Sequence, residues 1–228
     1  MKPSASQVEQ IVKEIKSAED KSLFVATRAF YDNSDIFVQG ALQRIWIETR
    51  YMPEDFEDWW IQSGNNEARW IENGIQLSTA KIWRITNFAI SPDTLSCIGD
   101  SESGDFGAAA QFISEYVTLG SDSIDEIEGG EEMAFSNLLF YFNDFEVNKE
   151  FRCNGLGHYL AAESLRIAGA MNFPFIVYPA RTEGYSEGND PERLRKFWMT
   201  FQDDMYWNEE WKVVYSRAFE IKSPEYEW

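Results

Sequence analysis

The spacing of apolar residues predicts a helix near the start of the chain. Ser6 and Glu9, three residues apart, form a capping-box pattern. The apolar positions that follow them at helical spacing are Val8, Ile11, Val12 and Ile15. Residues 22–31 fit either a helix or a strand, because their apolar positions match both periods.

Helical spacing continues in the next segment. Asp35 can cap a helix whose apolar face would be formed by Val38, Ala41, Leu42, Ile45 and Trp46. A further helix is expected to start near Pro53, because a proline followed by two acidic residues suits a first helical turn. The part of the chain from 1 to 75 is therefore expected to be mainly helical.

The pattern changes after Gly74. Residues 80–90 and 111–119 have the apolar character of strands. Residues 91–108 are loop-like by composition, and the acidic segment 120–132 predicts an exposed loop. The part from 76 to 135 is thus expected to hold strands and acidic loops.

Strands and helices are predicted to alternate in the rest of the chain. Residues 138–147 begin with five apolar residues, which is typical of a strand buried on both faces. The elements expected after it are a turn at 152–157, a helix at 158–170, a strand at 173–180, a helix from Asp190 through Phe201 and a strand at 211–221.

This order of elements predicts an α/β or α+β fold with a mostly continuous sheet. The sequence holds no internal repeat and no low-complexity linker, so one domain over residues 1–228 is expected. A content of 44% hydrophobic and 16% aromatic residues is enough for a packed core. The many aromatic residues also leave room for a homodimer interface.

Charge and cysteine content narrow the function. The net charge of −19 disfavours binding to nucleic acids or anionic membranes, and it suits either a cationic partner or simple solubility. Cys97, Cys153 and the single histidine cannot build a structural zinc site, so no metal is expected. Without an apolar leader segment, the chain is expected to be cytoplasmic.

The stretch FRCNGLGHYLAAESLRIA, residues 151–168, carries the main candidate site. Glycines that join a strand to a helix can form an anion cradle, because the first-turn amides and the helix dipole both favour negative charge. Two phosphate motifs do not fit: a GK[ST] sequence is missing, and Leu160 breaks the GxGxxG spacing. An ordinary glycine-bearing turn that binds nothing is the alternative.

The spacing Arg152-x-x-Gly155-x-Gly157 after a hydrophobic strand resembles the R/Q-x-x-G-x-G/A motif of the GNAT superfamily of N-acetyltransferases. The resemblance covers about residues 136–220, an acetyl-CoA-binding core that includes DPERLRKFWMTF and an aromatic final strand. It implies a GNAT-like mixed central sheet flanked by helices, with acetyl-CoA as cofactor and its pyrophosphate on the turn. The cofactor-binding residues that it implies are Phe145, Val147, Arg152, Cys153, Asn154, Gly155, Leu156, Gly157 and His158.

The resemblance also implies a reaction, the transfer of an acetyl group to a primary amine. The acceptor would be a cationic small molecule or a protein lysine or N-terminus, bound by the loops 91–108 and 120–132 or by the N-terminal helices. The family polarises the thioester carbonyl with a main-chain amide, which here lies near Phe145 to Val147. Asp144 and Glu146 share a strand face and are the candidate general bases, with a water relay or simple solvation as alternatives.

The base and the acid are the points at which the sequence departs from the family. Some relatives carry a carboxylate on the strand face of Val147, where this chain is expected to have Tyr141, Asn143 and Phe145. Trp198 stands where the family often has a tyrosine that protonates the thiolate, and tryptophan cannot do so. The candidate replacements are Tyr178, Tyr185 and Tyr206.

The remaining candidates surround the turn. His158 would meet the phosphates through its amide or ring, or simply lie on the helix surface. Cys153 could be oxidised or form a mixed disulfide with coenzyme A. The cations that could meet the outer phosphate are Arg181, Arg193, Arg195 and Lys196. Two further readings stay open: a catalytically inactive, acidic binding or regulatory protein on the same fold, and an α/β domain that binds another phosphate ligand.

Overall fold

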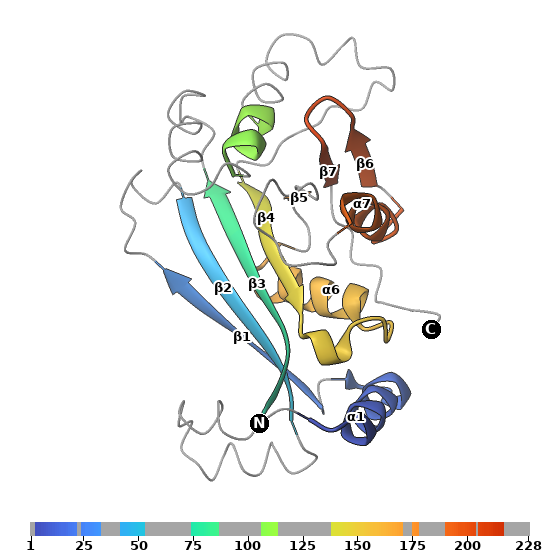
Figure 1. The fold of residues 1–228 in the computed structure, drawn as a ribbon. Helices are drawn as coiled ribbons and strands as arrows, with labels where there is room; N and C mark the ends of the chain where they lie inside the picture. Colours follow the sequence, from blue (N-terminus) through green and yellow to red (C-terminus); the bar gives the residue numbers. More distant parts are fainter. Residues whose placement is uncertain are drawn as a thin grey trace.

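A computed structural model describes residues 3–21, 24–32, 42–52, 74–86, 106–113, 138–170, 175–177, 190–203 and 205–216, and all structural statements below concern these residues. They form a twisted sheet with helices packed against it (Figure 1). The strands are β1 (Val25–Asp32), β2 (Leu42–Tyr51), β3 (Ile75–Thr86), β4 (Leu138–Val147), β5 (Phe175–Val177), β6 (Met205–Asn208) and β7 (Val213–Ser216). The helices are α1 (Ala5–Ser17), the 3₁₀ helix η4 (Lys149–Phe151), α6 (Gly157–Ile167), α7 (Pro191–Met199) and residues 106–113.

The described strands form one seven-stranded sheet in the order β1-β2-β3-β4-β5-β7-β6. Neighbouring strands are antiparallel, except that β4 and β5 run parallel on either side of the connection through α6. The expected fold class is confirmed at this level: an α+β protein with a mixed central sheet flanked by helices.

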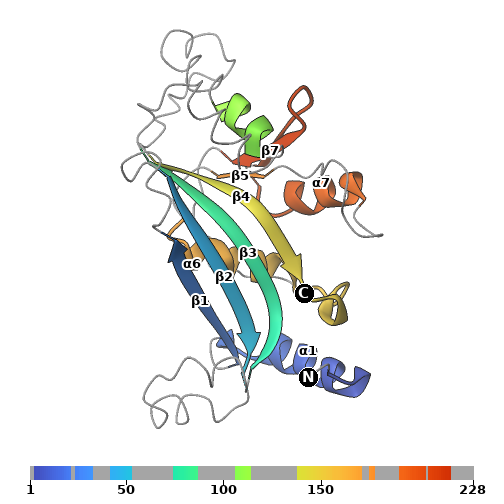
Figure 2. The same ribbon diagram turned by 60° about the vertical axis from the view of Figure 1, so that its left-hand side comes forward.

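The core is divided between the two faces of the sheet. On one face, α6 and α7 contribute Leu165 and Trp198 to a cluster with Ile45, Ile82 and Phe142 of the strands. On the other face, helical residues 106–113 bury two phenylalanines against the sheet, Phe106 and Phe112. Figure 2 shows the helical residues 106–113 toward one end of the sheet and α1 at the other end, near the end of β4.

Helix α1 closes that end of the sheet. Ile11, Val12 and Ile15 are buried against Phe151 of η4 and Leu160 of α6, as their spacing predicts. The expected capping box lies two residues earlier than predicted. Its cap is Ser4 rather than Ser6, with Gln7 as the reciprocal partner in place of Glu9.

The helix predicted after Asp35 is wrong where it can be checked, because residues 42–51 form strand β2. Asp35 itself lies outside the described residues. The supposed helix face is split by the sheet: Leu42 joins one core cluster, Ile45 the other, and Trp46 stays 44% exposed. Pairing with β3 from Leu42 to Tyr51 and with β1 from Arg44 to Tyr51 decides the conformation.

Other boundaries differ in smaller ways. The ambiguous segment 22–31 becomes β1, so the described part of residues 1–75 holds one helix and two strands rather than being mainly helical. Within the segment 111–119, predicted as a strand, residues 111–113 are helical, because Phe112 and Ile113 end a buried helix. That helix also includes 106–108, predicted as loop.

The predictions for the second half hold best. Strand β4, the turn, α6 and β5 lie where the pattern placed them, and Asp190 caps α7 by accepting a hydrogen bond from Glu192 N–H at 3.0 Å. Helix α7 ends at Met199, and β6 was not predicted. The helix from Pro53 and the loop 120–132 lie outside the described residues. None of the described helices has the length and apolar character needed to span a bilayer.

Candidate functional site

The glycine turn between β4 and α6 is held firmly at its start. Asn148 donates its backbone N–H to Leu77 O (2.8 Å) and its side-chain amide to Gln76 O (3.0 Å), which ties the end of β4 to β3. Its side-chain oxygen also accepts a hydrogen bond from Glu150 N–H and caps η4. Phe151, at the end of η4, is buried, so the turn starts from a packed position.

The turn contains two residues in the left-handed conformation. Cys153 has φ 61° and Gly155 has φ 77°, whereas Arg152 is extended and Leu156 is right-handed. The step from left-handed Gly155 to right-handed Leu156 turns successive N–H groups toward one concavity that suits an anion. Leu156 begins α6 without a side-chain cap, so no cap side chain satisfies the first-turn amides, which are the groups that bind anions at helix starts.

The two glycines are needed for different reasons. Gly155 adopts a left-handed conformation that L side chains rarely take. Gly157 has no such requirement, but a Cβ on it would lie 2.9 Å from Cε2 of Phe197 in α7. The second glycine of the motif is therefore also needed for α6 and α7 to pack together, because a side chain there would meet Phe197.

Two arginines flank the turn. Arg152 donates from Nε to Val147 O (2.8 Å) and forms an ion pair with Glu146 at 2.7 Å. Arg193, from α7, donates to Cys153 Sγ at 3.1 Å. Of the other predicted cations, Arg195 and Lys196 both pair with Glu192 on the same helix, and Arg181 lies outside the described residues.

His158 uses its ring to join two helices. Its Nε2 donates to Phe197 O (3.2 Å), and its ring centroid lies 4.5 Å from that of Phe197. Burial lowers the pKa of His158 from its usual 6.5, and the hydrogen bond to the Phe197 carbonyl only partly opposes this. The His158 ring is thus half-buried against α7, and its contact with a phosphate, through the ring or the main-chain amide, stays a prediction.

A bulge at Asn143 changes the side-chain alternation along β4. Asp144 pairs with Lys81 and Phe142 with Ile82, so one residue of β4 is extra. Phe142 and Phe145 consequently lie on one face, with ring centroids 5.7 Å apart. The expectation that Tyr141 shares the face of Phe145 is wrong: Tyr141 packs on the opposite face against Phe106.

The backbone of β4 is open along one edge beyond the bulge. In the described part of the chain, β5 pairs only with Phe140 to Phe142. Asn148 forms a hydrogen-bonded pair with Leu77, and antiparallel pairs alternate, so the N–H groups of Phe145 and Val147 point away from β3. These donors, predicted to polarise a carbonyl, therefore line the open edge.

The candidate bases lie on the sheet face opposite α6 and α7. Asp144 is the last member of a row of Cα partners across four strands, with Phe30, Trp46 and Lys81. Phe30 and Trp46 are 37% and 44% exposed, and Lys81 Nζ lies 5.3 Å from the Trp46 ring centroid. Glu146, two residues after Asp144 on β4, lies on the same sheet face, and its carboxylate forms an ion pair with Arg152.

Trp198 is a core residue. It is 4% exposed, and its ring lies 5.0 Å from Phe142, 6.0 Å from Phe145 and 5.4 Å from Phe201. Tyr206 cannot replace the missing acid at the turn, because it stacks on Tyr215 on the sheet face opposite α7. Tyr178 and Tyr185 lie outside the described residues.

Sequence reasoning missed a groove beside the turn. It has a volume of about 490 Å³ and is lined by Glu9, Val12, Lys13, Lys16, Ser17 and Asn154. No local pattern predicts it, because α1 and the turn are far apart in the sequence and meet only through packing. Comparisons with protein-family models, curated proteins and solved structures give no match to this chain.

Proposed function

We propose that this chain is an acetyl-CoA-dependent N-acyltransferase with a GNAT-like fold. The observation that carries the proposal is the turn itself: left-handed Cys153 and Gly155 lead into the uncapped start of α6, directly after a strand with an open edge. A diphosphate on these amides would be flanked by Arg152 and Arg193. The parallel strands on either side of α6 agree with the order of elements that the resemblance implies.

The acetyl thioester would lie along the open edge of β4. An N–H of Phe145 or Val147 would donate to the carbonyl oxygen and stabilise the negative charge that develops there. The amine nitrogen attacks the carbonyl carbon and forms the new C–N bond. The tetrahedral intermediate then collapses, the C–S bond breaks, and the coenzyme leaves as a thiolate that takes up a proton.

Proton transfer from the amine falls to the carboxylates of β4. A primary ammonium must lose one proton before attack and a second after the C–N bond forms. Asp144 and Glu146 both lie on the exposed sheet face, from which an acceptor would approach, and Glu146 also forms an ion pair with Arg152. Tyr178 stays the proposed proton donor for the thiolate, because Trp198 is buried and indole is not an acid.

The acceptor is proposed to be the primary amine of a cationic small molecule or protein. The exposed row on the sheet combines the Asp144 carboxylate with the aromatic side chains of Phe30 and Trp46, over whose rings Arg28 and Lys81 already hold cationic groups. Carboxylates and aromatic rings both attract ammonium groups. The net charge of −19 would also concentrate cationic acceptors near the protein.

Calorimetric titration with acetyl-CoA tests the cofactor, and two matched variants test the turn. Gly155→Glu places a carboxylate in the cradle, whereas Gly169→Glu places one at the far end of α6, where an added Cβ meets no atom within 4 Å. Both glycines are left-handed, with φ 77° and 74°, so both substitutions strain the backbone alike. We expect Gly155→Glu to lose binding and Gly169→Glu to keep it. Absence of binding to the wild type would refute the proposal.

A catalytically inactive, acidic binding protein on the same fold is the second candidate. The buried Trp198, at the position of the expected acid, favours it. Release of free thiol from acetyl-CoA, measured across a panel of amines, separates the two. Cofactor binding without thiol release on any amine would favour the binding protein, and tighter binding of a nucleotide than of coenzyme A would favour another phosphate ligand.

A further inference from the structure

The groove between α1 and the glycine turn has the residues of a binding site for a phosphorylated nucleoside. Lys13 and Lys16, three residues apart on α1, supply two ammonium groups, and Asn154 supplies an amide from the turn. Val12 adds an apolar surface, Ser17 a hydroxyl and Glu9 a carboxylate at the same groove. Two cations beside one cradle are notable in a chain with 20 basic and 39 acidic residues.

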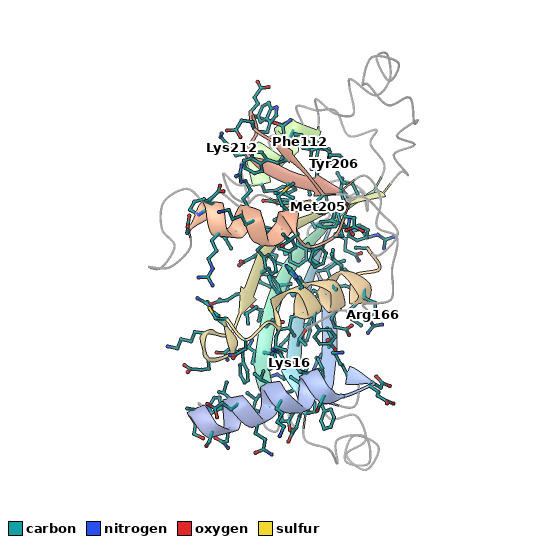
Figure 3. All side chains as sticks on the ribbon, turned by 90° about the vertical axis from the view of Figure 1, so that its right-hand side faces the viewer. Lys16, Phe112, Arg166, Met205, Tyr206 and Lys212 are labelled. Atoms are coloured by element: carbon teal, nitrogen blue, oxygen red, sulfur yellow. The ribbon has the colours of Figure 1, made fainter. Side chains whose placement is uncertain are left out.

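Helix α1 is fixed against the turn, so the groove is preformed. Its buried residues Ile11 and Ile15 pack in one cluster with Phe151 and Leu156, which begin and end the turn. Tyr51 of β2 also donates a hydrogen bond to Glu14 Oε2 at 2.5 Å. In Figure 3 the turn lies between α7 above and α1 below, and Lys16 is labelled near α1.

Asn154 belongs to both the turn and the groove, so the two adjoin. The other side of the turn is filled: Arg193 contacts Cys153, and Phe197 packs where a side chain at position 157 would lie. With the acyl arm along β4, the opposite end of the ligand is therefore directed toward α1.

We propose that this groove binds the 3′-phosphorylated adenosine of coenzyme A. The 3′-phosphate is one ribose away from the diphosphate, so a diphosphate on the turn brings it beside Lys13 and Lys16. Val12 packs against the nucleoside, and the protein selects coenzyme A over its 3′-dephospho form. This inference rests on the proposed function, because it starts from a diphosphate on the turn.

Calorimetric titration with coenzyme A and with 3′-dephospho-coenzyme A tests whether the groove recognises the 3′-phosphate. We expect the wild type to bind coenzyme A about tenfold more tightly, as two exposed charge pairs with a phosphate would give. The double variant Lys13→Gln/Lys16→Gln is expected to bind both ligands with the weaker affinity. Glutamine keeps the helix propensity of lysine, so α1 should stay folded.

The matched control neutralises two cations away from the groove, Arg166 and Lys212, which pair with Glu163 and Glu209. Arg166→Gln/Lys212→Gln has the same net charge as the test variant and is expected to keep the tenfold preference. Equal binding of both ligands by the wild type, or a preference that survives in the test variant, overturns the inference and leaves the proposed function standing. Binding of neither ligand overturns both.

Discussion

The two sides of the glycine turn are built differently. On the α7 side, aromatic rings fill the space: His158 and Phe197 pack on one another, and Trp198 is buried against Phe142. On the α1 side, an open groove of about 490 Å³ is lined by Val12, by the aliphatic stems and charged ends of Lys13, Lys16 and Glu9, and by Ser17 and Asn154. The turn thus has one side that fixes its shape and one side that can receive a ligand.

The comparison shows that one motif can satisfy two demands at once. Gly157 is required by contact with Phe197, which would hold in a protein that binds nothing. Gly155 and the left-handed Cys153 shape the amide concavity, which has no packing role in the described contacts. Substitutions on the α7 side should therefore change stability, and those on the α1 side should change ligand affinity.

The largest effect is expected for Trp198→Ala. Removing this ring from a closed aromatic cluster leaves a cavity and should lower the free energy of unfolding by about 3–5 kcal/mol. Chemical denaturation measures the loss. Trp46→Ala, at a position 44% exposed, is the control and should cost less than about 1 kcal/mol. Similar losses in both variants would contradict the assignment of Trp198 to the core.

A smaller destabilisation is expected for Gly157→Ala. The new methyl group would meet Phe197 at 2.9 Å in a packed cluster and should cost about 1–3 kcal/mol. Shortening the partner with Phe197→Leu should remove the clash, so in that background Gly157→Ala should be neutral or stabilising, as alanine is in a helix. A double-mutant cycle by chemical denaturation measures this coupling. Additive losses would show that the glycine serves another purpose.

The parts that the sequence predicted are those with local causes. The cap at Asp190 and the apolar start of β4 depend on neighbours in the chain, and both lie where expected. Strand β2 was predicted as a helix, because pairing with β1 and β3 outweighs a helical spacing of apolar residues.

In the candidate site, too, features with local causes could be predicted, and features set by contacts distant in the sequence could not. The turn around Gly155 could be predicted, since glycine spacing is local. The ring of His158 could not be placed, because its partner carbonyl, that of Phe197, lies 39 residues later in the chain. The bulge at Asn143 was equally out of reach, since register with β3 creates it, and it reversed the predicted faces of β4.

The pH dependence of stability should report on the partial burial of the His158 ring, which lowers its pKa more than the hydrogen bond to Phe197 raises it. Because the folded pKa lies below 6.5, the unfolded chain binds more protons between the two pKa values. The contribution of His158 is therefore complete above the unfolded pKa, falls as the pH drops through that window, and stays constant below the folded pKa. Urea unfolding between about pH 7.5 and about pH 5.5 should show a steeper loss in the wild type than in His158→Gln. Parallel curves would contradict a buried, neutral imidazole.

The smallest effect on stability is expected for Glu146→Gln, at the edge of the ligand side. Its pair with Arg152 is largely exposed, 62% and 42% for the two side chains, so losing it should cost less than about 1 kcal/mol. Arg152 would then be free to turn toward a phosphate on the cradle, and the affinity for coenzyme A should rise by about two- to fivefold. Calorimetric titration at low salt, where surface charges are least screened, measures the change.

Glu163→Gln provides the control, because it breaks the pair with Arg166 on α6, also 2.7 Å long, and should leave the affinity unchanged. A weaker affinity in Glu146→Gln would instead mean that Glu146 holds Arg152 in its binding position. Since Arg152 also donates to Val147 O, that outcome would make the end of β4 and its arginine one preformed anion site. The sign of this one change therefore separates competition for Arg152 from preorganisation of the turn.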